Sequence, residues 1–256
     1  MGKCRPRWDY NHYLQDLHDG CGQGTGADYK PQITIHDLPS QGVSARVFGH
    51  TTGRIHHLLS RLEEFYFYLM DFDPNVLDIR EQFPLRLTET LEIASCFNIR
   101  HPQKNSFPYP ITTDFLITRS DGLYARTIKP SAELEKKRVL EKFSIECQYW
   151  REKGIDWKIV TEKDIQWDKA RNLQWLYAGI SAKEAVPDAT LRKEACTCIL
   201  ELLAERQLSF PLILETVGEA LSIAQENVIP LFKDLVLSRR IAVNLDRPIN
   251  FMNPLS

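Results

Sequence analysis

A small set of polar side chains has the types and spacing that metal-assisted hydrolysis of a phosphodiester requires. Asp114 interrupts an apolar, β-branched run, Thr127 and Lys129 end the next such run, and Glu63 belongs to a separate amphipathic segment. Carboxylates bind divalent cations, a bound cation activates water, and a lysine stabilises negative charge on a phosphate. A simple cross-strand ion pair between Asp114 and Lys129 is the structural alternative, and such pairs are common in sheets.

The two apolar runs that carry these residues predict a β-hairpin. Residues 111–118 and 123–129 have strand composition, and the Asp121-Gly122 pair between them is a strong turn signal. The chemistry-bearing residues are therefore expected on neighbouring antiparallel strands.

The exact turn decides which residues face each other. A turn at 121–122 places Asp114 opposite Lys129, whereas a turn at 120–121 places Asp114 opposite Thr127. Because side chains alternate with period two, either register predicts Asp114, Thr127 and Lys129 on one face of the sheet.

Elements on either side of the hairpin must complete this domain. Helical spacing over residues 51–71 places His56, His57 and Glu63 on one helix, and a charged amphipathic helix is expected over about 132–153. Short strands are expected at 76–79, 83–87, 91–97 and 155–160. These patterns predict an α/β domain over residues 1–178.

The remainder, residues 179–256, has the element order of a winged helix. A linker at 179–187 precedes three expected helices and two short strands that could pair as a wing. The helices are expected at 188–205, 210–216 and 222–238, and the strands at 240–243 and 249–251. The third helix is poor in basic residues, which favours protein docking over DNA recognition.

Composition excludes some classes of protein. The chain has 256 residues, a formal net charge of -2 and 43% hydrophobic residues, which is typical of a globular protein. No window approaches the roughly 18 uninterrupted apolar residues of a membrane span. The N-terminus lacks the apolar stretch of an export signal, so a cytoplasmic location is expected.

The residues around the hairpin resemble a known family. Asp114 followed by Thr127-Ile128-Lys129 looks like the active site of the restriction-endonuclease-like nucleases, and five further segments match in order and spacing. The segments are Tyr29-Lys30-Pro31, Leu38-Pro39-Ser40-Gln41-Gly42, Leu59-Ser60-Arg61-Leu62-Glu63, Arg80-Glu81-Gln82-Phe83-Pro84-Leu85, and Gly154-Ile155-Asp156-Trp157-Lys158-Ile159-Val160-Thr161-Glu162. Together they resemble the TnsA family, the endonuclease subunits of heteromeric bacterial transposases.

The resemblance implies roles for individual residues. It implies Glu63, Asp114 and Lys129 as the active site, with Mg²⁺ or Mn²⁺ bound by Glu63, Asp114 and the backbone carbonyl of Ile128. Thr127 stands where restriction enzymes carry an acid, and a neutral hydroxyl is a poor direct ligand that can instead hold water. The implied fold is an α/β restriction-endonuclease-like nuclease domain followed by an all-α, winged-helix-like domain.

Three basic side chains are candidates for contact with DNA. Lys136 and Lys137 begin the helix that follows Lys129, and His57 is expected one to two turns before Glu63. In each case a solvated helix face is the structural alternative.

The resemblance also implies substrate and partners. The chain would cut the 5′, non-transferred strand at transposon ends, while a DDE transposase subunit (TnsB-like) cuts the 3′ strand. The C-terminal domain would contact an AAA+ regulator (TnsC-like). Two alternatives stay open on the sequence: a non-catalytic DNA-binding or architectural protein, and an autonomous nuclease of the host-defence kind.

Overall fold

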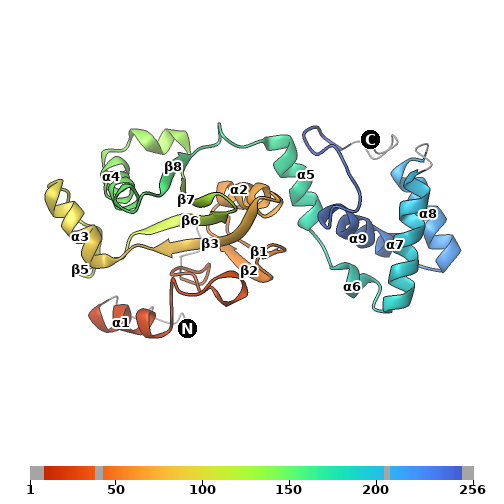
Figure 1. The fold of residues 1–256 in the computed structure, drawn as a ribbon, viewed down its shortest axis with the longest axis horizontal. Coiled ribbons are helices and arrows are strands. Elements are labelled where there is room, and N and C mark those ends of the chain that lie inside the picture. The colour runs from red at the N-terminus through yellow and green to blue at the C-terminus, as the bar shows by residue number, and fades with distance from the viewer. Residues whose placement is uncertain (1–8, 38–42, 205–207, 250–256) are drawn as a thin grey trace. The chain divides into compact units, whose positions relative to one another are not determined.

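The computed structural model describes residues 9–37, 43–204 and 208–249, and the chain divides into two compact units (Figure 1). The first unit is Met1–Ile165 and the second is Gln166–Ser256. This division falls earlier than the boundary expected after residue 178, because α5 (Trp167–Tyr177) belongs to the second unit. The side chain of Asn172 on α5 donates hydrogen bonds to the backbone carbonyls of Leu245 and Arg247 in that unit.

The first unit contains a four-stranded sheet with helices and two short hairpins around it. Its helical elements are α1 (Tyr10–His18), η1 (Gly26–Asp28), α2 (Arg61–Asp71), α3 (Leu87–Cys96), η2 (Ser131–Glu135) and α4 (Lys137–Glu152). Its strands are β1 (Ala45–Gly49), β2 (Arg54–Leu58), β3 (Val76–Pro84), β4 (Gln103–Lys104), β5 (Phe107–Pro108), β6 (Thr112–Arg119), β7 (Gly122–Ile128) and β8 (Asp156–Val160).

The central sheet has the strand order β3-β6-β7-β8. The first two pairings are antiparallel, whereas β7 and β8 are parallel and are joined across the sheet by α4. Arg119 pairs with Gly122 and Thr118 pairs with Leu123, so the hairpin turn is Ser120-Asp121. Of the two registers left open by the sequence, this is the one in which Asp114 is opposite Thr127.

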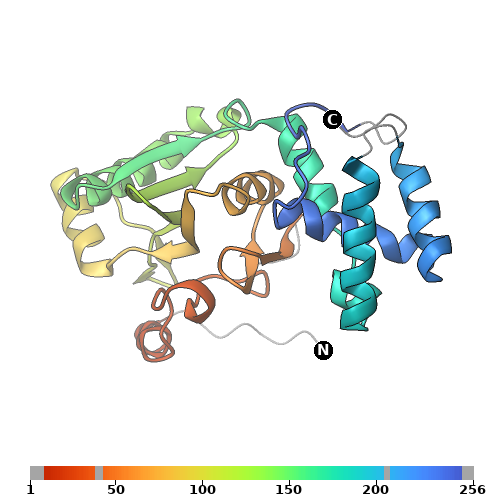
Figure 2. The same ribbon diagram turned by 45° about the vertical axis from the view of Figure 1, so that its right-hand side comes forward.

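Helices α2 and α4 cover opposite faces of this sheet (Figure 2). The Tyr66 ring of α2 lies 5.7 Å from the Phe115 ring, measured between centroids. The next residue of β6, Leu116, packs in a core cluster with Ile145 and Trp150 of α4. Because neighbouring strand residues point to opposite faces, the two helices enclose the sheet from both sides.

The helix expected over residues 51–71 is wrong in its first half. Residues 54–58 form β2, which pairs with β1 as a hairpin, and only Arg61–Asp71 is helical. His56 and Leu58 are buried on alternate positions of the strand, while Gly53 takes a φ of 69° in the preceding turn. The spacing of apolar residues fits a helix and a strand equally well in a segment this short.

Of three further expected strands, one is wrong, one is incomplete and one is confirmed. The segment expected as a strand over 91–97 lies in α3. Only residues 83–84 of the expected strand 83–87 belong to β3, whereas 76–79 lies wholly within β3. By contrast, the expected strand at 155–160 is confirmed as β8, and the expected helix at 132–153 is confirmed from Lys137 onward as α4.

Among the described residues of the second unit, every regular element is a helix, and loops join the helices. The helices are α5, α6 (Ala182–Ala185), α7 (Ala189–Ala204), α8 (Phe210–Leu221) and α9 (Gln225–Leu237). The three expected helices are confirmed as α7, α8 and α9, and α6 lies in the expected linker. Described residues 240–249 form no strand, so the expected wing is not formed there, and residues 250–251 of its second strand lie outside the described residues.

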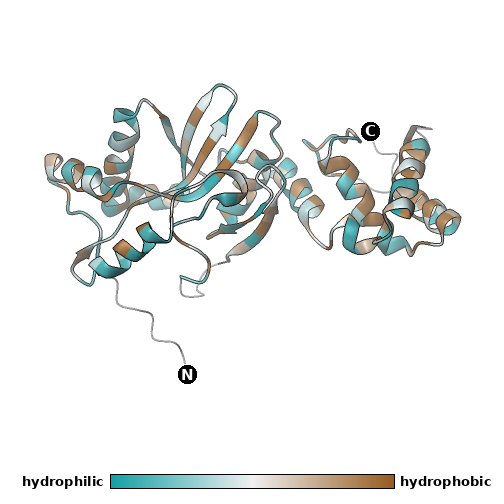
Figure 3. Cartoon of the chain, turned by 60° about the horizontal axis from the view of Figure 1, so that its bottom comes forward, coloured by the Kyte–Doolittle hydropathy of each residue, from teal (hydrophilic) through white to brown (hydrophobic). Residues whose placement is uncertain are grey.

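Helices in both units carry hydrophobic and hydrophilic bands along their length (Figure 3). This amphipathic pattern fits packing of one helix face and exposure of the other to water. Among the described residues, no helix has the length and apolar character needed to cross a membrane.

Candidate active site

Glu63 is held at the first turn of α2 by its own helix cap. Ser60 is the N-cap residue, and its Oγ accepts the Glu63 N–H and donates to Glu63 Oε1 at 2.9 Å. The Leu59 N–H donates to Glu63 Oε2 at 3.0 Å. The side chain is only 6% exposed. Capping of this kind stabilises the start of a helix by itself, and here it also fixes the position of a buried carboxylate.

Asp114 is fixed by the backbone of the neighbouring strand. The Ile128 N–H donates to Asp114 Oδ2 at 2.6 Å, near the end of β7. The Ile128 backbone N–H is therefore in direct contact with the Asp114 carboxylate, and the role of the Ile128 carbonyl as a metal ligand stays a prediction.

Gln82 joins the two carboxylates, although the sequence analysis did not select it. Its Nε2 lies 3.4 Å from Glu63 Oε2 and 3.3 Å from Asp114 Oδ1 and donates to both. The Gln82 side chain is 2% exposed. One neutral amide thus bridges two acids that come from different elements.

The carboxyl groups here carry perturbed pKa values. Burial raises the pKa of Glu63, and the neighbouring Asp114 carboxyl raises it further. Burial also raises the pKa of Asp114, although Lys142, the Ile128 N–H and Gln82 act in the opposite direction. Buried acids with raised pKa values that repel one another indicate a site where a bound cation would stabilise their charged forms.

Thr127 lies against α4, where it contacts a third acid. Its hydroxyl donates to Glu146 Oε1, and the Thr113 hydroxyl donates to the same oxygen at 2.6 Å. The Thr127 hydroxyl oxygen in turn accepts a hydrogen bond from Trp157 Nε1 at 3.1 Å. Glu146 is fully buried, burial raises its pKa, and its Oε2 has no hydrogen-bond partner among the described residues. The Thr127 hydroxyl is therefore engaged in orienting Glu146.

Two lysines supply positive charge close to these acids. Lys129 directly follows β7, and its backbone N–H donates to the Val160 carbonyl at 2.9 Å. Lys142 lies one helical turn before Glu146 on α4 and lowers the pKa of both Asp114 and Glu146. Its effect on Asp114 exceeds that of Lys129. Lys142 is not among the site residues predicted from the sequence.

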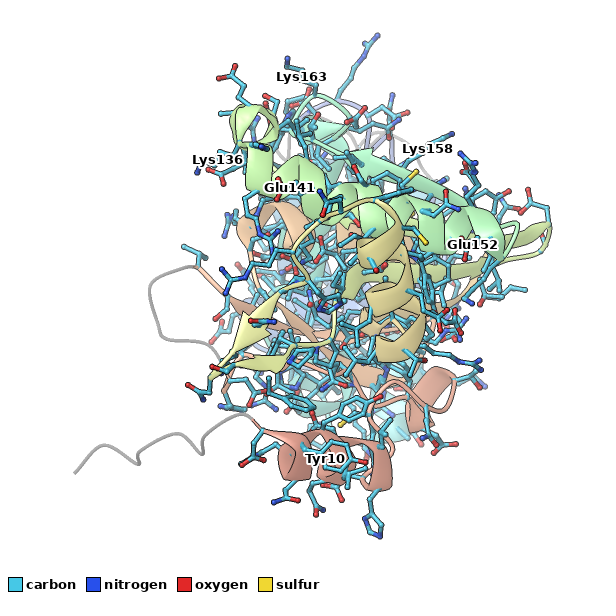
Figure 4. All side chains as sticks on the ribbon, turned by 90° about the vertical axis from the view of Figure 1, so that its left-hand side faces the viewer. Tyr10, Lys136, Glu141, Glu152, Lys158 and Lys163 are labelled. Atoms are coloured by element: carbon cyan, nitrogen blue, oxygen red, sulfur yellow. The ribbon has the colours of Figure 1, made fainter. Side chains whose placement is uncertain are left out.

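The candidate DNA contacts lie on two different elements. The side chains of Lys136 and Lys137 are 61% and 91% exposed at the start of α4, where they pair with Glu133 and Glu141. Lys136 and Glu141 are labelled in Figure 4. His57 lies on β2, which corrects its expected place on the helix of Glu63.

His57 is also less basic than a free histidine. Burial lowers its pKa, and the positive charge of Arg46 and the neighbouring His36 lower it further, against the opposing effect of Glu81. The ring is consequently neutral near pH 7, which weakens any electrostatic contact with phosphate.

Comparison with known proteins shows which family this chain resembles. Residues 73–162 match the family model described as TnsA-like endonuclease N terminal, and residues 164–245 match the one described as TnsA endonuclease C terminal. The chain is 40% identical over 181 residues to the Transposon Tn7 transposition protein TnsA of Escherichia coli. It belongs to the TnsA endonuclease family. The aligned region covers 70% of this chain and 66% of that relative.

The family matches agree with the division into two units. The two TnsA matches meet between residues 162 and 164, close to the change of unit after Ile165. Asp114 and Lys129 lie inside the nuclease match, whereas Glu63 precedes it.

The residues present fit the divalent ion that membership of the TnsA family implies. Glu63 and Asp114 offer carboxylate oxygens, and the backbone of Ile128 is adjacent. Hard divalent cations prefer such all-oxygen surroundings, and Mg²⁺ commonly uses only one or two carboxylates. Within the described ranges no three His, Cys, Asp or Glu side chains are grouped as a ready-made metal cluster. A third protein ligand would therefore have to be a neutral oxygen or an acid that moves.

Proposed function

We propose that this chain is a divalent-metal-dependent DNA endonuclease that cuts the 5′, non-transferred strand at transposon ends. The observation that carries the proposal is the pairing of Glu63 and Asp114 across a single neutral amide, with Lys129 at the end of the adjoining strand. Membership of the TnsA family supports the choice of DNA and of transposon ends as the substrate.

Each side chain has a distinct task in this proposal. Glu63 and Asp114, with the Ile128 carbonyl, would hold Mg²⁺ or Mn²⁺, which supplies Lewis-acid activation of water and of the phosphate. The Leu59 and Ser60 caps keep Glu63 in place, and the Ile128 N–H keeps Asp114 in place. Preorganised ligands of this kind avoid a reorganisation cost during the reaction.

Lys129 stabilises negative charge on the phosphate that is cut. Its side chain has no hydrogen bond or ion pair among the described residues, so it is available for this contact. Thr127 acts indirectly in this proposal, because its hydroxyl orients Glu146 and does not reach toward the paired carboxylates.

Contacts with DNA away from the cut would come from exposed cations. We assign Lys136 and Lys137 to backbone phosphates near the site, since both precede the acid-facing part of α4. We assign His57, with its neutral ring, to hydrogen bonding and not to charge pairing.

The helical second unit is proposed as the docking part of the chain. Its α9 helix buries Val228, Leu231 and Phe232 and carries few cations, which suits packing and protein contact better than phosphate binding. Partners of a TnsA-type subunit would be a DDE transposase (TnsB-like) and an AAA+ regulator (TnsC-like). The winged-helix topology would require strands from residues beyond those described.

The test is cleavage of a donor plasmid that carries transposon ends, with and without a purified DDE transposase and with Mg²⁺, Mn²⁺ or chelator. The expected result is metal-dependent 5′-strand cleavage at the ends only when the transposase is present. Cleavage without the transposase would instead indicate an autonomous nuclease. Normal 5′ cleavage by an Asp114→Asn, Glu63→Gln double variant would indicate that this chain only binds DNA or partners.

A further inference from the structure

The neutral amide of Gln82 lies within hydrogen-bond distance of both paired carboxylates. Its amide nitrogen donates to Glu63 Oε2 and to Asp114 Oδ1 at 3.4 and 3.3 Å, and both contacts are long for N–H···O bonds. A protonated amine or a metal ion would neutralise the two acids, whereas this amide offers only two neutral N–H groups. The amide therefore satisfies the pair weakly.

Gln82 has an unusual backbone conformation, and the strand register places it next to Asp114. Gln82 has a φ of 47°, in the left-handed region that residues other than glycine rarely adopt. In the β3–β6 register, Glu81 pairs with Phe115 and Phe83 with Thr113, so Gln82 lies opposite Asp114. Such a conformation is unfavourable and persists only where surrounding contacts fix it. One of these is the Gln32 N–H, which donates to the Gln82 carbonyl at 3.3 Å.

The other end of the amide has a partner that tolerates either orientation. The Thr112 hydroxyl donates to Gln82 Oε1 at 3.1 Å, and Thr112 is itself buried. A hydroxyl can donate or accept a hydrogen bond. If the amide turned by 180° about its last side-chain bond, its NH₂ group would donate to Thr112 and its oxygen would face the two carboxylates. Neither orientation leaves the amide unpaired at Thr112.

We propose that Gln82 is a reversible metal ligand. In the metal-free protein its NH₂ group bridges Glu63 and Asp114, and in the metal-bound protein the turned amide offers Oε1 to the ion. It thereby supplies the neutral oxygen that Thr127 does not, since the Thr127 hydroxyl is engaged by Glu146. This inference rests on the metal site of the proposed function.

The test measures binding of Mn²⁺ alone, without DNA and without cleavage. Titration calorimetry and the rise in melting temperature on adding Mn²⁺ are compared for the wild-type protein, Gln82→Leu, Gln82→Glu and Asp114→Asn. Gln148→Leu is the matched control, because the one side-chain hydrogen bond of Gln148 to the described residues is an exposed bond to Glu152 on α4.

We expect Gln82→Leu to weaken Mn²⁺ binding about tenfold, because an oxygen ligand is lost, and Gln148→Leu to leave it unchanged. Gln82→Glu should bind Mn²⁺ more tightly at pH 7.5 and should melt at a lower temperature than wild type without metal, because three acids then face one another. If Gln82→Leu does not fold, the Gln82→Glu comparison decides, and unchanged Mn²⁺ affinity in that variant would overturn the proposal.

The outcomes separate this inference from the proposed function. Equal or tighter Mn²⁺ binding by folded Gln82→Leu would show that the ion merely displaces the amide, which would refute the ligand role alone. Failure of the wild-type protein to bind Mn²⁺, or binding that Asp114→Asn does not reduce, would instead refute the metal site of the proposed function.

Discussion

Buried acids at two places in the first unit have opposite surroundings: one is Glu81 of β3, and the other is the group formed by Glu63, Asp114 and Glu146 at the candidate site. Glu81 is fully buried and accepts hydrogen bonds from Arg54, from His56 Nδ1 at 2.8 Å and from the His57 N–H at 3.2 Å. Burial alone would raise the pKa of Glu81, but the bonds from Arg54 and His56 outweigh it and lower the pKa to about 2. This carboxylate is charged, paired and structural.

The acids of the candidate site have no such hydrogen-bond partner among the described residues. Glu63, Asp114 and Glu146 are bonded by hydroxyls, backbone N–H groups and an amide, all of them neutral, and the pKa of each acid is raised by burial. The charge of the hydrogen-bond partners therefore distinguishes a structural buried acid from the acids of the candidate site. Where a buried acid is hydrogen-bonded by cationic side chains of the same chain, it stabilises the fold, and where buried acids are bonded only by neutral groups, they are suited to bind a cation.

Removal of Asp114 should have the largest effect on activity. Asp114→Asn should reduce 5′-strand cleavage by at least about 10³-fold, because metal catalysis contributes several kcal/mol and 1.36 kcal/mol corresponds to tenfold. The protein should stay folded, since an amide can still accept from the Ile128 N–H. The measurement is the single-turnover cleavage rate, and Asp156→Asn on β8 is the control, as Asp156 is part exposed and pairs with Arg126. A folded Asp114→Asn protein with normal rates would show that the site is misassigned.

Breaking the compensated group should have the largest effect on stability. Arg54→Met leaves the Glu81 carboxylate buried without its main cation and should lower the free energy of unfolding by roughly 3–5 kcal/mol. Glu63→Gln removes an uncompensated charge and should leave metal-free stability unchanged or raise it slightly at pH 8. Denaturant unfolding in chelator measures both. A larger loss for Glu63→Gln than for Arg54→Met would erase the distinction between the two groups.

The two groups should also respond to pH in opposite directions. The folded pKa of Glu81 is lowered to about 2, so its stabilising contribution is present above pH 4.5 and is lost as the pH falls toward 2. The folded pKa of Glu63 is raised to about 8, so its contribution is present below pH 4.5 and is lost as the pH rises toward 8.

Unfolding free energies measured in chelator from pH 5 to 8.5 should therefore fall less steeply for Glu63→Gln than for the wild-type protein. Added Mg²⁺ should flatten the wild-type curve, because it neutralises the ionised pair. Identical slopes for both proteins in chelator would contradict the raised pKa of Glu63.

The smallest effect is expected at the surface cations, which belong to neither group. Lys136→Ala with Lys137→Ala should weaken DNA binding modestly and reduce the slope of log affinity against log salt by about two, one for each phosphate contact. Fluorescence anisotropy with a transposon-end duplex at several salt concentrations measures this slope. Lys158→Ala on β8, also exposed, is the control. An unchanged slope would place the DNA path away from the start of α4.

The β6–β7 hairpin and β8 could be predicted from the sequence because their signals are local. Asp121-Gly122 marks the turn region, and alternating apolar residues mark the strands, so Asp114 and Thr127 were correctly placed on neighbouring strands. The choice of turn residues depended on the twist and register of the whole sheet, and no local signal decides it.

Gln82 could not be predicted, because its role exists only through long-range register. It is opposite Asp114 only when β3 pairs with β6, more than thirty residues later, and it meets Glu63 only when α2 packs beside them. The strand that contains His56 was not predicted for a related reason. The Glu81 carboxylate and the Thr52 hydroxyl bond the two ring nitrogens of His56, which allows this polar side chain to be buried. Hydropathy gives no indication of these bonds.

The backbone caps on the two carboxylates make the site observable by NMR without any substitution. The Leu59 N–H donates to Glu63 and the Ile128 N–H donates to Asp114, so each acid has one main-chain amide proton of its own. The chemical shifts of these two protons report the charge and the occupancy of each carboxylate separately. An ¹⁵N-labelled sample titrated with acid or with a diamagnetic ion would thus follow the two halves of the site as independent signals.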